Sequence, residues 1–135
     1  MTRRELRENV FKLLFRLEFN SLDEMPEQVK LYFDWHEELD EKEHKYIEDK
    51  YNAILSKLDE IDKDIEAASE GWKLSRMGKV DLTLIRLAVY EMKYDPSVPT
   101  GVAINEAVEI SKIFGGDESP AFINGILAKL VPAEA

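Results

Sequence analysis

The apolar positions of this chain recur at the spacing of an α-helix along nearly its whole length. Near the start, apolar side chains follow the pattern i, i+4, i+7, i+8 and i+11, at Leu6, Val10, Leu13, Leu14 and Leu17. This pattern predicts a first helix over about residues 3–19. The same reasoning predicts further helices over the ranges 26–39, 47–58, 61–65, 82–94, 100–114 and 119–131. No segment alternates with the two-residue period of a strand, so we expect an all-α protein of about seven helices.

The helix ends are predicted from glycine, proline and capping residues. Asp81 is a candidate N-cap for the fifth helix. The sixth helix is apolar around most of its circumference, which predicts a central, well-buried helix. Gly115 and Gly116 are expected to end it in the left-handed conformation. Ser119 followed by Pro120 predicts the start of the last helix, with the serine as N-cap.

The loop between the last two helices combines acids and aromatic rings. Asp117 and Glu118 lie in it, with Phe114 on one side and Phe122 on the other. A loop of this kind either connects two helices and does nothing more or forms a binding surface. Its residues alone leave both interpretations open.

Length and composition predict one domain, 1–135, with an N-terminal half of about 1–70 and a C-terminal half of about 71–135. No apolar run reaches the roughly 20 residues that span a membrane, so no membrane partner is expected. The first ten residues lack the apolar core of a secretion signal, and the chain has no cysteine. These features fit a cytoplasmic protein.

The net charge of −10 at first argues against a nucleic-acid partner, but the charge is unevenly distributed. Residues 1–22 carry five bases and three acids, whereas residues 23–70 carry six bases and seventeen acids. Residues 71–135 carry seven bases and eight acids. Binding of an anion is therefore expected to be local, at the N-terminal end and in the C-terminal half.

The sequence offers no basis for catalysis. His36 and His44 lie eight residues apart, roughly 12 Å along a helix axis, which is too far to share a metal. The glycines form no phosphate-binding loop, and no serine has a histidine partner that we can identify. We therefore predict no enzyme, no catalytic residue, no metal and no cofactor.

The first helix places basic and aromatic side chains together. At 100° per residue, Arg4, Arg7, Phe11 and Phe15 fall side by side next to the leucine stripe. Guanidinium groups bind phosphates and aromatic rings stack on unpaired bases, so this combination suits RNA. The two rings also fit the edge of a wide apolar core face, and for the rings alone this is the favoured interpretation.

Three segments carry a family resemblance: "RRELRENVFKLLFRLEF" near the start, "VDLTLIRLAVYEM" in the middle and "VPTGVAINEAVEISKIFGGDESPAFINGIL" toward the end. Together they resemble the NusB transcription antitermination factors. The last segment is the most specific, and the resemblance spans nearly the whole chain. It implies two small packed helical bundles and an RNA-binding subunit without catalysis. It also implies pairing with NusE, a small-subunit ribosomal protein, and binding of single-stranded boxA RNA in nascent ribosomal transcripts, within the transcription elongation complex. Both monomers and homodimers are compatible with the resemblance.

The resemblance also assigns roles to single residues. The arginine-rich opening of the family matches Arg3, Arg4 and Arg7, and the RNA-facing loop matches Phe114, Glu118 and Phe122. Positions that approach the NusE partner match Phe15 and Asp81, where an N-cap role for Asp81 is an equally good explanation.

A carboxylate can face RNA because base edges carry donors. Arginines bind the phosphates, rings stack on bases, and Glu118 would accept from an exocyclic amine. An alternative function stays open: a protein-interaction module that docks a basic, ribosomal-type partner through the acidic middle helices, without touching RNA.

Overall fold

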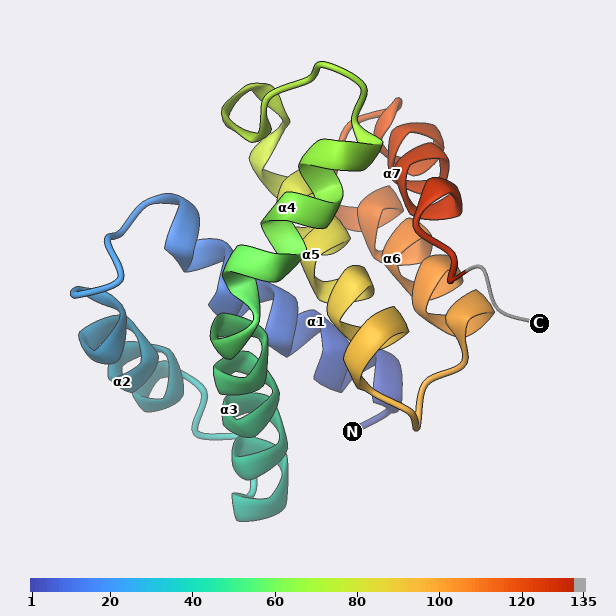
Figure 1. Cartoon of the computed structure of the whole chain (residues 1–135). Coiled ribbons are helices and arrows are strands. Elements are labelled where there is room, and N and C mark those ends of the chain that lie inside the picture. The colour runs from blue at the N-terminus through green and yellow to red at the C-terminus, as the bar shows by residue number, and fades with distance from the viewer. Residues whose placement is uncertain (133–135) are drawn as a thin grey trace. The chain divides into compact units, whose positions relative to one another are not determined.

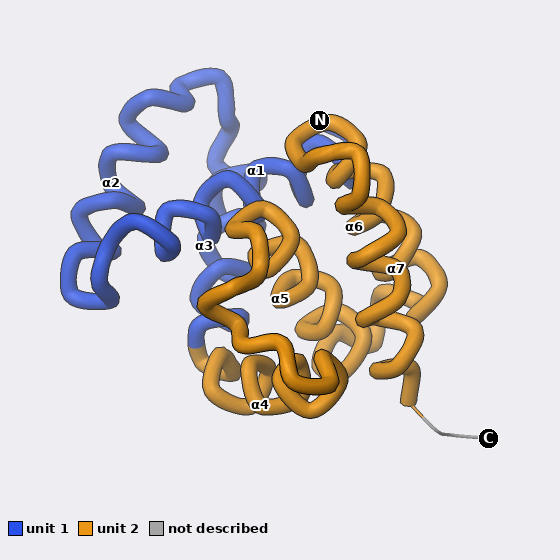
Figure 2. Tube along the Cα trace, turned by 90° about the horizontal axis from the view of Figure 1, so that it is seen from above, with its two compact units in different colours: residues 1–55 blue, residues 56–135 orange. Residues whose placement is uncertain are grey.

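Every regular element in the described part of the chain is helical. A computed structural model describes residues 1–132 and contains, within them, seven α-helices, two short 3-10 helices and no strand (Figure 1). The prediction of an all-α protein with about seven helices is confirmed. The helices form two compact units, Met1–Leu55 and Ser56–Ala135, coloured separately in Figure 2. One domain with halves of about 1–70 and 71–135 stays a prediction.

Unit 1 holds three helices, which begin and end where local hydrogen bonds dictate. They are α1 at Arg3–Phe15, extended by the 3-10 helix η1 at Arg16–Glu18, then α2 at Met25–Trp35 and α3 at Glu41–Ser56. The helix predicted over 26–39 ends early because His36 leaves the helical conformation, with φ −117° and ψ 61°. Before α3, the Asp40 side chain accepts from the backbone N–H of Glu43, and the Glu43 carboxylate accepts from the N–H of Asp40.

Unit 2 holds the remaining helices. They are α4 at Leu58–Ala68, the 3-10 helix η2 at Leu74–Arg76, α5 at Lys79–Tyr94, α6 at Thr100–Phe114 and α7 at Ser119–Lys129. Helix α4 separates from α3 at Lys57, whose φ of −116° and ψ of 9° interrupt the helical path. The helices predicted over 47–58 and 61–65 thus correspond to α3 and α4, which are both longer than predicted.

Helix α5, and not α6, is the central helix of unit 2. It packs against α4, α6 and α7 (Figure 1), and every residue from Leu82 to Val89 is buried. On α6 the buried residues are confined to one side, at Ala103, Ala107, Ile110 and Ser111, while Val102 and Ile113 are exposed. The prediction of a buried sixth helix was wrong, because apolar composition does not reveal how many neighbours cover a helix.

A buried charge on α5 is compensated by its neighbour α4. The Arg86 side chain is largely buried, and its Nε and Nη2 donate to the two carboxylate oxygens of Asp62, each at 2.9 Å. This two-pronged geometry matches the planar guanidinium to the carboxylate and satisfies both groups. It fixes the register of α4 on α5, which positions the segment that follows α4.

Two buried tyrosines of unit 1 differ in how their hydroxyls are satisfied. Tyr32 Oη donates to Asn9 Oδ1, whose amide nitrogen in turn donates to the carbonyl of Glu5 at 2.9 Å. Tyr51 Oη is buried without a hydrogen-bond partner among the described residues. Burial raises the pKa of both phenols, that of Tyr51 to about 12.

Replacing each tyrosine by phenylalanine should therefore have different effects on stability. Tyr32→Phe leaves Asn9 Oδ1 buried without its donor and should lower the free energy of unfolding by about 1–3 kcal/mol. Tyr51→Phe removes an unsatisfied hydroxyl and should leave that free energy unchanged or raise it. Urea denaturation followed by circular dichroism measures both. Equal losses in the two variants would contradict the assignment.

Candidate functional site

An open groove in unit 2 gathers three of the side chains singled out from the sequence. It is bounded by the segment before α5, the first turn of α5, the α6–α7 loop and the first turn of α7. Its walls are formed by Trp72, Arg76, Met77, Gly78, Asp81, Gly116, Asp117, Glu118, Ser119, Ala121 and Phe122. We call it the α5–α7 groove. Asp81, Glu118 and Phe122, which lie up to 41 positions apart in the chain, thus share one surface.

The α6–α7 loop is shaped by a close approach at Gly115. The backbone there is extended, with φ −97° and ψ −173°, and Gly71 is the only described glycine with a positive φ. A Cβ at residue 115 would lie 2.6 Å from Ser119 Oγ and 2.9 Å from the carbonyl oxygen of Ser111. The expected left-handed ending at Gly115 and Gly116 was wrong. Glycine is needed at 115 because a side chain does not fit there.

Ser119, a residue of α7, stabilises this loop by a hydrogen bond. The N-cap of α7 is Glu118, so Ser119 is the first helical residue and not the cap that was predicted. Its buried hydroxyl accepts a hydrogen bond from the backbone N–H of Gly116 at 3.0 Å. The loop is thereby tied back onto the helix, and Asp117 and Glu118 remain exposed.

Asp81 faces the groove from within helix α5. The N-cap of α5 is Gly78, so Asp81 stands in the first turn and the N-cap prediction was wrong. A carboxylate in this turn is favoured by the partial positive charge of the helix N-terminus. Asp117 and Glu118 also line the groove, and Arg76 is the basic residue of its wall, so the groove carries more acid than base.

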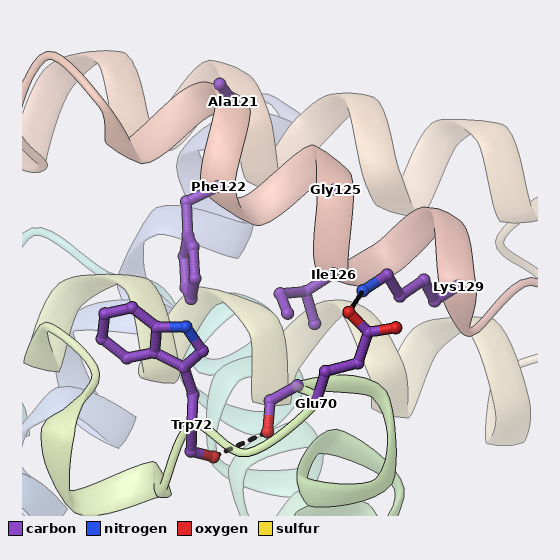
Figure 3. A pocket seen from close by; sticks show the side chains of 8 residues that line it. Glu70, Trp72, Ala121, Phe122, Gly125, Ile126 and Lys129 are labelled. Carbon is purple, nitrogen blue, oxygen red and sulfur yellow. Dashed lines mark hydrogen bonds and ion pairs between the residues drawn. The ribbon is translucent and has the colours of Figure 1, made fainter.

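Two aromatic rings form an apolar wall beside these acids. Trp72 and Phe122 meet nearly edge to face, with ring centroids 6.4 Å apart and an interplanar angle of 65° (Figure 3). Trp72 is 57% exposed although it is one of the largest side chains in the protein. Its carbonyl accepts from the Ser69 hydroxyl at 2.7 Å, which anchors the backbone beneath the ring.

The same two rings line a second, smaller pocket that continues along α7. Figure 3 shows its walls, which include Ala121, Gly125, Ile126 and the ion pair of Lys129 with Glu70 at 3.1 Å. The turn that carries Glu70 is unusual, because Glu70 has a φ of 50° and Gly71 a φ of 98°. This left-handed pair reverses the chain after α4 and presents Trp72 to α7.

The contribution of Trp72 and Arg76 was missed from the sequence. They lie in the segment "GWKLSRMG", between the helices predicted over 61–65 and 82–94, for which no role was predicted. The sequence did contain a signal: a tryptophan lies between two glycines, with basic residues nearby. So short a segment cannot bury a side chain of that size in a core of its own, which indicates a ring at the surface. Phe114, by contrast, ends α6 with 36% of its surface exposed and lies outside the walls of the groove.

The basic residues predicted to bind RNA lie on α1, in unit 1. Arg3 and Arg4 are exposed in its first turn, whereas Arg7 is only 8% exposed. Glu5, which lies among them, forms a capping box with Thr2, and the hydrogen bond from the Thr2 backbone N–H lowers the pKa of its carboxyl. Its charge is therefore used locally to start the helix.

Phe15 belongs to a ladder of three rings, two on α1 and one, Phe19, directly after η1. Its ring centroid lies 5.7 Å from that of Phe11 and 5.2 Å from that of Phe19. Phe11 is buried, Phe15 half-buried and Phe19 exposed, so the ladder runs from the interior to the surface. The predicted core role holds for Phe11, and Phe15 keeps a partly accessible face.

The histidines and acids assemble no metal centre in the part of the chain that the structure describes. His36 stacks on Tyr32 and His44 on Phe33, with centroids 4.0 Å and 3.7 Å apart. Of the helices within residues 1–132, none has the length and apolarity that a bilayer crossing requires.

Comparison with known proteins gives one consistent family. The chain matches the model of the NusB family over residues 4–132. The transcription antitermination protein NusB of Lachnoclostridium phytofermentans is 51% identical over 131 residues, covering 97% of this chain and 99% of that protein. The protein of the same name from Agathobacter rectalis is 52% identical over 129 residues, with coverages of 96% and 98%.

Solved structures share the fold. The structure of T. maritima NusB superposes with a TM-score of 0.89 at 34% identity, covering 100% of this chain and 94% of that one. A crystal structure of the antitermination factors NusB and NusE in complex with dsRNA superposes with a TM-score of 0.85 at 22% identity, with coverages of 98% and 97%. At that identity the second likeness speaks for the fold alone.

The close approach at Gly115 predicts a sharp difference between two neighbouring glycines. Gly115→Ala should lower the free energy of unfolding by about 1–3 kcal/mol, because the new methyl group collides with Ser119 and Ser111. Gly116→Ala is the control, since a Cβ there meets nothing within 4 Å. Thermal and urea unfolding measure the difference. If both variants lose the same stability, the loop is not held by this contact.

Proposed function

The chain belongs to the NusB family, whose members are non-catalytic antitermination factors, and we propose that it pairs with NusE and binds single-stranded boxA RNA in nascent ribosomal transcripts. In this role it acts in the cytoplasm, as a subunit of the transcription elongation complex. The observation that carries the proposal is the α5–α7 groove, in which the loop residue Glu118 and the ring of Phe122 share one open surface.

The chemistry of the groove favours bases over phosphates. An exposed carboxylate repels the phosphate backbone, but it accepts hydrogen bonds from the exocyclic amines and ring N–H groups of unpaired bases. The exposed ring of Trp72 and the neighbouring Phe122 offer apolar surface on which a base can stack, worth about 1–3 kcal/mol per base in comparable sites. The groove is therefore suited to reading splayed bases of a single strand.

Phosphate binding is assigned to the start of α1. Arg3 and Arg4 are exposed beside the N-terminal backbone N–H groups of the helix, which themselves attract anions. Arg7 is nearly buried, so in this proposal it supports the basic turn and contributes less to the phosphate contact. We propose that these arginines hold the phosphates of the strand, while Phe114 and the groove contact its bases.

The partner contacts are assigned to Asp81 and Phe15. Asp81 adds a carboxylate to the groove from the first turn of α5, where a basic side chain of NusE would find it. The half-buried Phe15 and the exposed Phe19 add apolar surface of the kind that is enriched in protein interfaces. With a net charge of −10, the chain alone is expected to bind RNA weakly and to depend on its partner.

Binding of labelled boxA RNA tests the proposal directly. Fluorescence anisotropy should show weak binding by the protein alone, and NusE should strengthen it several-fold or more, because the partner supplies charge and surface that this chain lacks. A scrambled strand of the same composition is the control. Equal affinity for boxA and the scrambled strand, with NusE present, would contradict the proposal.

The loop acids allow a matched test of base reading. Glu118→Gln should change the preference between boxA and its single-base variants by about 1–3 kcal/mol, since the amide offers a donor where the carboxylate only accepted. Asp117→Asn, the exposed neighbour, removes the same charge and should change all affinities together. If Glu118→Gln leaves the preference untouched, or acts only as Asp117→Asn does, Glu118 does not read a base.

A further inference from the structure

Helix α2 exposes an apolar patch that the proposed function does not use. At 100° per residue, one side of α2 and its N-cap carries Glu24, Glu27, Leu31, Asp34 and Trp35. All five are exposed, while the opposite side buries Met25 and Tyr32 in unit 1. We call these five residues the α2 face.

Trp35 is the most exposed large apolar side chain among the described residues. It is 80% exposed, and Leu31, one helical turn earlier, is 38% exposed. A surface helix normally places polar groups on its solvent-facing side. A tryptophan and a leucine in the middle of that side are therefore unusual. Tryptophan is also the residue type most enriched among the anchors of protein interfaces.

The surroundings of this pair are strongly acidic. Residues 22–38 carry six acids and one base, and the base, Lys30, is engaged with Asp34 at 3.2 Å. Glu27 lies on the same side as Leu31, and the exposed Glu37 and Glu38 follow directly after Trp35. An apolar centre with an acidic rim is the complement of a basic segment that carries apolar side chains.

We propose that the α2 face is a docking surface for a basic protein segment. Trp35 and Leu31 would pack against apolar side chains of that segment, and its lysines or arginines would pair with Glu27 and Glu38. A second copy of this chain does not fit, because a two-fold interface would place the same acidic rim against itself. RNA does not fit either, because the α2 face has no basic residue to hold phosphates and the nearby Lys30 pairs with Asp34, whereas the wall of the groove includes Arg76.

This surface is separate from the site of the proposed function. It lies in unit 1 and shares no residue with the α5–α7 groove or with the arginines of α1. The protein would then hold a further, basic member of an assembly while it binds RNA. Loss of the α2 face should therefore leave binding of boxA RNA in the presence of NusE unchanged.

The test uses the full-length protein and two labelled peptides as probes. One is an amidated helix of about 16 residues with lysines and a leucine stripe, and the other has the same lysines with serine in place of leucine. Anisotropy titrations at about 0.15 M salt limit the contribution of charge alone. The leucine peptide should bind, and Leu31→Ser with Trp35→Ser should weaken it about tenfold or more.

Matched variants separate docking from general attraction. Val102→Ser with Ile113→Ser removes two exposed apolar side chains from α6 and should have little effect. Glu27→Lys with Glu38→Lys should weaken binding by several-fold more than Asp59→Lys with Glu66→Lys, which changes the same charge on exposed positions of α4. Changes below twofold in the α2 variants, or equal losses in the controls, would overturn the proposal.

Two further outcomes would also overturn it. The first is a change from dimer to monomer on Trp35→Ser, measured by sedimentation, because the α2 face would then be an interface between two copies of the chain. Weaker pairing with NusE in the same variant would make the face part of the contact already proposed. An unchanged sedimentation coefficient and unchanged NusE pairing, together with the loss of peptide binding, support a separate docking surface.

Discussion

The structure of unit 2 depends on the burial of α5 on several sides at once. Its residues from Leu82 to Val89 are all covered, and α4, α6 and α7 each pack against it. Such a helix tolerates a charged residue only with a partner, and the paired hydrogen bonds of Arg86 with Asp62 supply it. The α5–α7 groove follows from this arrangement, because its walls are the segments that enter α5 and α7.

In the proposed function, the groove lets an acidic protein bind RNA through its bases. Its carboxylates repel phosphates but can accept hydrogen bonds from base edges. Its aromatic rings can stack on the faces of unpaired bases. In the proposed function, other residues and the partner protein hold the phosphate backbone. This division explains why a net charge of −10 is compatible with membership in a family of RNA-binding factors.

Sequence periodicity predicted the positions of the helices well, but it predicted poorly which helix is most buried. The register of Leu6, Val10, Leu13 and Leu14 is determined by local spacing, and the helix it predicts is present. The burial of α5 rather than α6 depends on which helices pack together, which spacing does not encode.

The conformations of Gly115 and Ser119 likewise depend on a contact across the loop. Asp81, Glu118 and Phe122 were predicted from a family pattern. Trp72 was missed because its place beside Phe122 depends on the turn at Glu70 and Gly71.

The two tryptophans of the chain are distributed one to each unit, Trp35 on α2 and Trp72 beside α7, and both are largely open to solvent. Indole emission shifts to shorter wavelength when water is displaced from the ring. The protein therefore carries a natural spectroscopic reporter on each of its two candidate surfaces. With either indole replaced, the intrinsic emission of the other would reveal which surface an added molecule has reached, with no dye attached.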